Sequence, residues 1–149
     1  FSHRIDDIVN TYLDDFRHSS IEQTQAFITR VQKEITEGRT ILWVLTLKGN
    51  NTYIGTVCLW NISKGDCKAE TGYTMNPRFH GKGYMNEALA KIIDCGFTKI
   101  KLKSIEAYTH EHNESSIKLL VRNKFKQEAT HKKEAGNNRI FFVLKRDSD

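Results

Sequence analysis

The segment Asn76-Pro-Arg-Phe-His-Gly-Lys-Gly-Tyr-Met-Asn-Glu-Ala-Leu, residues 76–89, decides the fold of this chain. It places Arg78-x-x-Gly81-x-Gly83 between a segment with the pattern of a strand and one with the pattern of a helix. Glycine lacks a Cβ atom, so the backbone can turn sharply there and approach a ligand closely. The helix that follows offers unpaired N–H groups and the positive end of its dipole to an anion such as a pyrophosphate. An ordinary tight turn can show the same two glycines, so the rest of the chain must decide between the two interpretations.

The rest of the chain carries a mixture of helix and strand patterns. Apolar residues at helical spacing indicate helices, and short apolar runs bounded by turn residues indicate strands. In chain order the patterns predict two helices, three strands, a helix, a strand, a helix and two strands: 4–18, 20–38, 41–47, 53–61, 68–75, 83–97, 103–109, 113–122, 126–131 and 138–145. No repeat, low-complexity segment or linker interrupts them, so residues 1–149 are predicted to form one domain.

Two local details accompany this layout. Ser20 is predicted to cap the second helix, with Gln23 as its partner in a capping box. Asn50 and Asn51 suit the positive-φ positions of the hairpin between the first two strands.

Composition limits the class of protein. The chain has 38% hydrophobic and 28% charged residues, which is typical of a soluble globular domain, and its 149 residues suffice to bury a core. No apolar run is long enough to cross a membrane, and the charged first residues do not form a signal peptide. Cys58, Cys67 and Cys95 are odd in number and lack metal-ligand spacing, which favours a reducing cytoplasm.

The net charge of +5 comes from the second part of the chain. Residues 1–95 contain 11 Lys/Arg and 11 Asp/Glu, whereas residues 96–149 contain 12 Lys/Arg and 7 Asp/Glu. A basic region of this kind suits a phosphorylated ligand or nucleic acid, and a solvated surface explains it as well. Nucleic-acid binding is not predicted, because no recognised motif accompanies the charge and no aromatic residues are interleaved with it.

The order of the elements around the Arg-x-x-Gly-x-Gly loop resembles the GNAT superfamily of acyl-CoA-dependent N-acetyltransferases, and most of all its branch of ribosomal-protein N-terminal acetyltransferases. Four segments carry the resemblance. They are the central strand Ala-Glu-Thr-Gly-Tyr-Thr-Met-Asn-Pro (69–77), the pyrophosphate loop and helix start (78–87), the helix Asn-Glu-Ser-Ser-Ile-Lys-Leu-Leu (113–120) and the strand entry Asn-Lys-Phe-Lys-Gln-Glu (123–128). With Trp43 and Ile54-Gly55, they extend over nearly the whole chain.

The chain departs from the family pattern in two places. Lys124 stands where the family usually has glycine before the phenylalanine, which puts the local turn in doubt. The family's first strand has no counterpart before the first predicted helix, so that strand is predicted to be missing from this chain.

The resemblance implies an α+β fold with a central, mostly antiparallel sheet that splays at its middle and is flanked by helices. It also implies transfer of an acetyl group from the cosubstrate acetyl-CoA to a primary amine, by direct attack on the thioester. The amine is a protein N-terminal α-amine, a polyamine or another small amine, and the sequence does not say which. No metal and no membrane partner is implied, and a homodimer is left open. The alternative is a catalytically idle acyl-CoA-binding module that keeps the fold for regulation.

The resemblance also assigns residues to the cofactor. Backbone N–H groups of the glycine loop hold the pyrophosphate, and one near Thr74 or Met75 polarises the thioester carbonyl. Lys118 and Arg122 lie one turn apart and either reach the 3′-phosphate or form a solvated helix face. The predicted cofactor-binding residues are Thr74, Met75, Arg78, His80 (through its backbone), Gly81, Lys82, Gly83, Tyr84, Asn113 and Ser116.

Ser116, Glu70 and Asn113 are the predicted catalytic residues. Asn113 and Ser116 share a helix face. By resemblance, Asn113 fixes the pantetheine amide and Ser116 donates a proton or a hydrogen bond to the departing thiolate. A helix-capping Asn followed by a surface Ser is the alternative. Glu70, on the central strand, is either the general base or an ordinary strand-face carboxylate.

Other polar and aromatic residues are given plainer roles. Tyr73 alternates to the strand face opposite Glu70 and is predicted to belong to the core. His110 and His112 have no third metal ligand and are assigned to a solvated loop, with a weak base role for His112 as the alternative. Tyr108 either lines the cleft or packs, and Trp43 and Trp60 are assigned to the core or the cleft wall.

Overall fold

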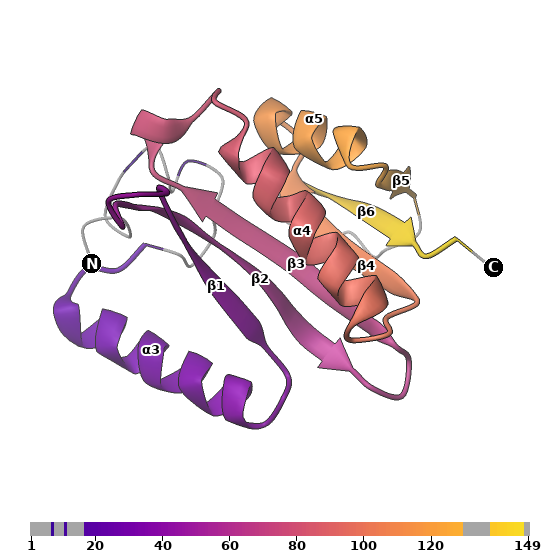
Figure 1. Cartoon of the computed structure of the whole chain (residues 1–149), viewed down its shortest axis with the longest axis horizontal. Coiled ribbons are helices and arrows are strands. Elements are labelled where there is room, and N and C mark those ends of the chain that lie inside the picture. The colour runs from indigo at the N-terminus through magenta and orange to yellow at the C-terminus, as the bar shows by residue number, and fades with distance from the viewer. Residues whose placement is uncertain (1–6, 8–10, 12–16, 130–137, 148–149) are drawn as a thin grey trace.

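The computed structural model of the chain describes Asp7, Thr11, residues 17–129 and residues 138–147. Six strands form one sheet in the order β1-β2-β3-β4-β6-β5 (Figure 1). The strands are β1 (Ile41–Thr46), β2 (Tyr53–Ser63), β3 (Lys68–Met75), β4 (Ser104–His110), β5 (Lys126–Glu128) and β6 (Arg139–Lys145). The described helices are α3 (Ile21–Thr36), α4 (Tyr84–Thr98), α5 (Glu114–Arg122) and the short 3-10 turn η1 (Pro77–Phe79). The predicted α+β fold is confirmed.

The sheet opens at its middle. All neighbouring strands are antiparallel except β3 and β4, which run parallel. Their pairing covers only Lys68–Glu70 against Ser104–Glu106, although β3 continues to Met75 and β4 to His110. The two strands therefore separate after Glu70 and Glu106, as the prediction of a splayed, mostly antiparallel sheet requires.

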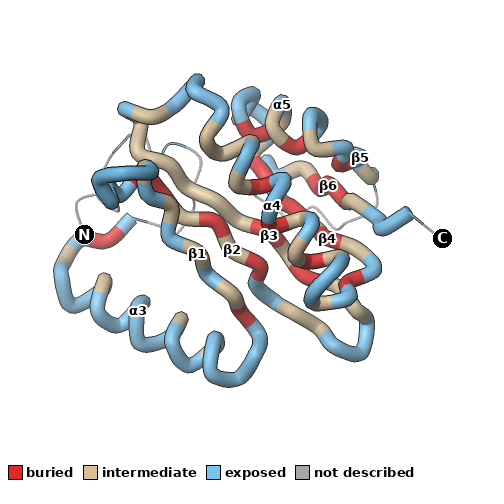
Figure 2. Tube along the Cα trace, in the orientation of Figure 1, coloured by how far each residue is buried: buried red, intermediate tan, exposed pale blue. Residues whose placement is uncertain are grey.

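One face of the sheet carries the core. Alternate residues of the strands point to the same side, so Val57 and Leu59 of β2 share that side with Ile105 of β4. They pack with Ile92 of α4 and Leu120 of α5, and the buried stretches of these elements lie together in Figure 2. Burial of each such side chain contributes about 1.5–3 kcal/mol, which is what holds α4 and α5 on this face.

The helix α3 lies apart from that core, at the β1 end of the sheet (Figure 1). None of its residues is buried, and Ile28 and Ile35 are 48% and 44% exposed. The predicted cap is confirmed, because the Ser20 hydroxyl oxygen accepts from the Gln23 N–H at 3.3 Å. The capping box is wrong by one residue, since the Gln23 side chain accepts from the N–H of Ser19 and not of Ser20.

The predicted elements within the described residues are present, with bounds mostly within two residues of the prediction. The exception is the strand predicted at 126–131, which ends at Glu128. The helix predicted at 4–18 falls largely outside the described residues. In the first hairpin the φ angle of Asn51 is positive, as predicted, at 55°. The second residue with a positive φ is Gly49, at 101°, and not Asn50 as predicted. No helix among the described residues has the length and apolarity needed to cross a membrane.

Candidate active site

A cleft of about 610 Å³ opens where β3, the glycine loop and the first turns of α4 and α5 meet. Arg78 and Lys82, both exposed, do not line it, and the Lys82 ammonium lies over the Phe79 ring at 5.6 Å. The other predicted cofactor-binding residues all line it: Thr74, Met75, His80, Gly81, Gly83, Tyr84, Asn113 and Ser116. Residues of three predicted segments thus meet at one cavity, whereas Arg78 and Lys82 face solvent.

The glycine loop has the backbone of an anion site. Gly81 and Gly83 have φ angles of 71° and 80°, which side-chain-bearing residues rarely adopt. Among the residues that the structure describes, no atom lies within 4 Å of a Cβ atom placed at either position, so the space beside them is open. Gly83 precedes α4, and no side chain of the described residues caps that helix. The first N–H groups of α4 therefore remain available to an acceptor in the cleft.

Side chains fix this loop to the end of β3. The His80 ring nitrogen Nε2 lies 3.0 Å from the carbonyl oxygen of Met75. The side-chain oxygen of Asn76 accepts from the Arg78 N–H at 3.1 Å. The His80 ring thus joins the loop to the strand, while the prediction that His80 binds the cofactor through its backbone stays a prediction.

Asn113 and Ser116 line the opposite wall. The Asn113 side-chain oxygen accepts from the Ser116 N–H at 3.2 Å and caps α5. Its amide NH₂ has no partner among the described residues, so it can donate into the cleft. Ser116 is only 9% exposed, which rules out the alternative of a surface serine.

Tyr73 reaches the same place from β3. It packs against the core, as predicted, and it also lines the cleft. Its hydroxyl oxygen lies 2.7 Å from that of Ser116. Burial raises the pKa of Tyr73 to about 12, although the hydrogen bond with Ser116 lowers it, so the phenol stays neutral at physiological pH. Strand alternation predicted the face of Tyr73 but could not predict this partner, which is 43 residues away in sequence.

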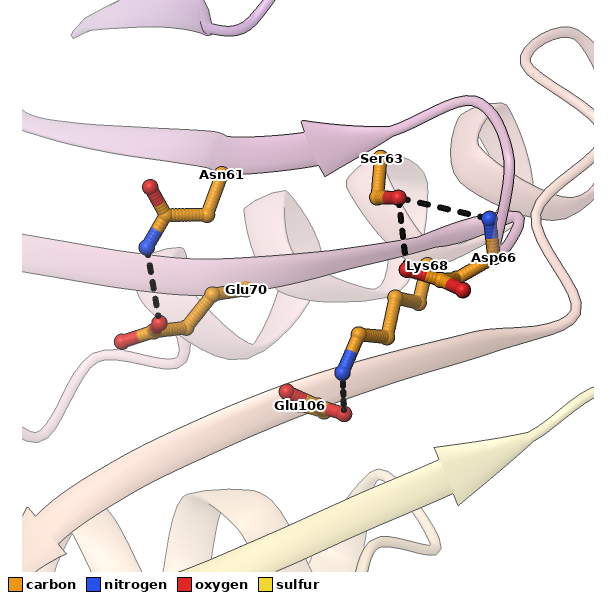
Figure 3. Close-up of polar contacts among 6 residues, drawn as sticks. All are labelled: Asn61, Ser63, Asp66, Lys68, Glu70 and Glu106. Atoms are coloured by element: carbon orange, nitrogen blue, oxygen red, sulfur yellow. Dashed lines mark hydrogen bonds and ion pairs between the residues drawn. The ribbon is translucent and has the colours of Figure 1, made fainter.

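Glu70 lies on the other face of β3, beside Glu106 of β4 (Figure 3). The Asn61 amide donates to Glu70 at 3.3 Å, and the Lys68 ammonium pairs with Glu106 at 3.1 Å. The pKa of Glu70 is raised to about 7, mainly by burial and in smaller part by the negative charge of Glu106. The Asn61 hydrogen bond and the positive charges of Arg139 and Lys68 act in the opposite direction. A carboxyl with this pKa exchanges its proton near neutral pH.

The position of Glu70 differs from that of the other predicted residues. It does not line the cleft, and strand alternation places it on the face opposite Tyr73. It is, however, the last residue of β3 that pairs with β4, at the point where the two strands separate. Glu70 and the Tyr73–Ser116 pair therefore lie on two sides of the same opening in the sheet.

The remaining candidates have mostly structural surroundings. Tyr108 does not line the cleft, and its ring lies 5.0 Å from that of Phe141. Trp43 packs against the core, whereas Trp60 is 39% exposed. The loop predicted for both histidines is wrong for His110, which ends β4, whereas His112 lies exposed in the turn after it. Their rings lie 5.3 Å apart, and no group of three or more His, Cys, Asp or Glu suited to a metal occurs among the described residues. Lys118 and Arg122 do line the cleft.

One contact of the cleft wall had no signal in the sequence. The Asn123 amide, at the end of α5, donates to the side-chain oxygen of Asn86 at 2.9 Å. Asn86 lines the cleft from α4, so this bond fixes the distance between the two helices that form its walls. Only the fold brings these two residues together.

The cavity fits a long anionic cofactor. It joins an uncapped helix start and an open glycine loop at one wall to the free amide of Asn113 at the other, with Lys118 and Arg122 beside them. Such an arrangement provides donors for a pyrophosphate, for amide groups and for a terminal phosphate.

Comparisons with known proteins agree. The family model of the acetyltransferase (GNAT) domain matches residues 2–126. The chain is 32% identical over 120 residues to the protein described as "Uncharacterized N-acetyltransferase p20" of Bacillus licheniformis, a match that covers 80% of this chain and 67% of that protein. The curated relatives that the chain matches are thus longer, and it spans about two thirds of their length.

Two solved structures share the fold. The ribosomal L7/L12 alpha-N-protein acetyltransferase RimL, in complex with coenzyme A, gives a TM-score of 0.83 at 18% identity, over 95% of this chain and 85% of that one. A mutant of the spermidine N-acetyltransferase SpeG of Vibrio cholerae gives 0.72 at 20% identity, over 86% of this chain and 76% of that one. Since the family model covers most of the chain, the chain belongs to the GNAT acetyltransferase family and is an acetyl-CoA-dependent N-acetyltransferase.

Proposed function

We propose that this chain transfers the acetyl group of acetyl-CoA to a protein N-terminal α-amine, a polyamine or another small amine. One observation carries the proposal: the cleft lined by the open glycine loop is also lined by Asn113 and the buried Ser116, beside the separation of β3 and β4. A cofactor that binds both ends of this cleft has its thioester near the opening in the sheet. An amine on the other side of the sheet then meets it there.

The cofactor-binding roles follow from the donors that the cleft presents. The N–H groups after Gly81 and Gly83 bind the pyrophosphate, and Lys118 or Arg122 binds the 3′-phosphate. The Asn113 amide donates to the pantetheine arm. A backbone N–H of Thr74 or Met75, on the part of β3 that no longer pairs with β4, polarises the thioester carbonyl.

The chemical roles fall to Glu70 and Ser116. An amine must lose a proton before or during attack, and Glu70 accepts it directly or through water. The new C–N bond forms, the C–S bond breaks with its electron pair on sulfur, and Ser116 donates to the sulfur as charge develops there. The acetyl carbonyl carbon is the electrophile, and the chain contributes by binding the substrates and by accepting the amine proton.

Two kinds of acceptor amine occur among the proteins that share this fold. By their names, RimL acts on a protein α-amine and SpeG on spermidine. Both acceptors are ammonium ions at neutral pH and need a base. Glu70 meets that need equally for either one, so the structure favours an amine acceptor without selecting one.

Thermal denaturation with acetyl-CoA tests the cofactor site first. A ligand that binds only the folded chain stabilises it by about 2.7 kcal/mol at a hundredfold excess over its dissociation constant. We expect a clear rise in Tm, and a Tm that does not change at millimolar acetyl-CoA would contradict the proposal.

Thiol release from acetyl-CoA then tests the transfer, across peptides with free α-amines, spermidine and lysine. Release that depends on one of these amines is the expected result. A chain that is stabilised by acetyl-CoA but releases no thiol with any amine would be the idle binding module instead.

A further inference from the structure

Tyr73 and Ser116 form a pair of hydroxyls in the wall of the cleft. One comes from β3 and the other from α5, and their oxygens lie 2.7 Å apart. Both side chains line the cleft, and both hydroxyls are largely buried. The phenol has no partner other than Ser116 among the described residues. The role assigned to Ser116 above does not use Tyr73.

The number of protons in this pair decides what it can offer. Two hydroxyls carry two protons, and the hydrogen bond between them uses one. When Tyr73 donates to Ser116, the Ser116 proton is left over, and its O–H can turn toward a ligand. In the opposite arrangement Ser116 donates to Tyr73, the phenol proton is left over, and Ser116 has no proton to offer to a ligand.

We propose that Tyr73 is a positioning residue for acetyl transfer, donating to the Ser116 oxygen so that the Ser116 O–H points at the departing sulfur. This inference rests on the proposed function. It assigns to β3 a second contribution besides the backbone N–H near Thr74 and Met75. A phenol is the stronger donor of the two hydroxyls, and donation from Tyr73 leaves the smaller, movable serine proton for the ligand.

The pair donates a hydrogen bond and does not transfer a proton. The pKa of Tyr73 is about 12, whereas an ordinary thiol has a pKa of about 8.5, so moving a proton from the phenol through Ser116 to the thiolate is uphill by about a thousandfold or more. The C–S electron pair therefore stays on a thiolate that accepts from Ser116. That thiolate takes its proton from solvent after release, and both hydroxyls keep theirs.

The test measures the thiol pKa of bound CoA and needs no acceptor amine. Thiolate absorbance near 240 nm is followed with pH for the protein saturated with CoA. The same protein saturated with desulfo-CoA is subtracted, so that its own cysteines and tyrosines cancel. A donor aimed at the sulfur favours the thiolate and lowers the midpoint of this titration.

Tyr73→Phe removes only the phenol oxygen, and Ser116→Ala only the serine hydroxyl. We expect each variant to raise the midpoint relative to the wild type, Ser116→Ala by about one pH unit and Tyr73→Phe by less. In the Ser116→Ala background, Tyr73→Phe should cause no further change, because its effect passes through Ser116. Affinity for desulfo-CoA should stay within about twofold in all three variants.

Thr71→Val is the matched control. Thr71 is a buried hydroxyl on the same face of β3, two residues away, and it donates to the Cys58 carbonyl outside the cleft. Its loss should lower Tm and leave the thiol midpoint unchanged.

A wild-type midpoint in Tyr73→Phe would overturn the inference and leave the proposed function standing if Ser116→Ala still raises it. Equal shifts in Tyr73→Phe and Thr71→Val would also overturn it, since the effect would then be one of general packing. Failure of the wild-type protein to bind CoA would overturn the proposed function itself, and the inference with it.

Discussion

The two sides of the opening between β3 and β4 are built in different ways. On the cleft side, α4 and α5 pack on the core, so the helix starts that line the cleft have a packed support. On the Glu70 side, the sheet carries exposed large side chains, among them Val44 and Trp60, at 60% and 39% exposed, and α3 has no buried residue. Figure 2 shows this contrast as buried stretches under α4 and α5 and exposed ones along α3.

This difference matches the difference between the two substrates of an acetyltransferase. The donor is always acetyl-CoA, and a preformed cleft suits a fixed ligand because little ordering is needed on binding. The acceptor varies within the family, and a side with few packed contacts can change without harm to the core. We therefore expect substitutions on the cleft side to act on all acceptors alike, and substitutions on the other side to depend on the amine and on pH.

Glu70→Gln should have the largest effect, and it tests the open side. As a general base, Glu70 must be ionised, so wild-type kcat/KM should rise with pH through about 7, the pKa that burial gives this carboxyl. The variant should lack this rise and be slower by about 10²-fold or more at neutral pH. Its defect should shrink at higher pH, where the amine loses its proton unaided. Steady-state rates from pH 6 to 9 measure both effects.

Glu106→Gln is the control for Glu70. The negative charge of Glu106 raises the pKa of Glu70, and its removal also frees Lys68 to lower that pKa. This variant should keep its activity but show the rise at lower pH. A pH profile in Glu70→Gln that matches the wild type would leave Glu70 as an ordinary strand carboxylate.

Stability gives an independent check on the same carboxyl. The pKa of Glu70 rises from 4.5 to about 7 in the folded chain, so the folded state binds the proton more tightly. The stability that this proton provides is complete below pH 4.5 and is lost as pH rises through 7. The Tm of Glu70→Gln should therefore improve relative to the wild type as pH increases over that range.

Gly83→Val is the next largest change, and it tests the cleft side. A valine at φ 80° is strained, and its side chain enters the open space where the pyrophosphate is expected. Affinity for CoA should fall by about 10²-fold, which corresponds to the loss of one or two hydrogen bonds to a charged group. Calorimetric titration measures this loss.

Gly49→Val separates strain from ligand contact. Gly49 also has a positive φ, of 101°, and nothing within 4 Å of its would-be Cβ, but it lies in the hairpin between β1 and β2. The Gly49→Val variant should lose about as much stability as Gly83→Val and keep its CoA affinity. If both variants bind CoA like the wild type, the loop at Gly83 is a simple turn.

The sequence predicted the cleft side far better than the open side, for a physical reason. The glycine loop, the Asn113 cap and the strand β3 are local signals, since turn residues and caps act on the backbone within a few residues. The tie between Asn86 and Asn123 and the bond between Tyr73 and Ser116 join residues far apart in the chain. No local pattern specifies such pairs, so they emerge only from packing.

The ionisation of Glu70 lay equally beyond the sequence. Its pKa depends on burial and on Glu106, Lys68 and Arg139, which come from three strands. The sequence predicted a strand and a face for Glu70, but not which charges stand beside it. The Gln23 and Asn50 errors are smaller and of another kind, because each places the right interaction one residue away from its true position.

Ser116→Ala should have a moderate effect that appears in kcat. A hydrogen bond to a charged group contributes about 1.5–3 kcal/mol, so kcat should fall by about 10-fold to 10²-fold. The KM for acetyl-CoA should change little, because the sulfur gains its charge only in the transition state. The measurement is a steady-state comparison on a confirmed acceptor. A variant with wild-type kcat would limit the Asn-x-x-Ser helix to positioning the cofactor.

Lys124→Gly should have the smallest effect, and it tests whether the strained backbone turn after α5 helps to position the cleft residues of that helix. After α5, the Phe125 N–H donates to the Leu120 carbonyl and the Lys124 N–H to the Val121 carbonyl, which is the Schellman arrangement of a helix end. That arrangement places Lys124 at a φ of 69°, where the family usually has glycine. A non-glycine residue there costs about 1–2 kcal/mol, of which glycine's greater freedom in the unfolded chain offsets a part.

We therefore expect Lys124→Gly to raise the free energy of unfolding by about 0.5–1 kcal/mol, a rise in Tm of about 2 °C for a chain of this length. Lys101→Gly should act in the same direction, because Lys101 has a φ of 64°, whereas Lys99→Gly, at −93°, should not stabilise. Since Lys124 lies outside the cleft, its change should leave CoA affinity unaltered if packing of Leu120 and Phe125 alone fixes α5. A change in CoA affinity that accompanies the rise in Tm would mean that the strained turn itself sets the position of Asn113 and Ser116, and the cleft side would then be less rigid than its buried core suggests.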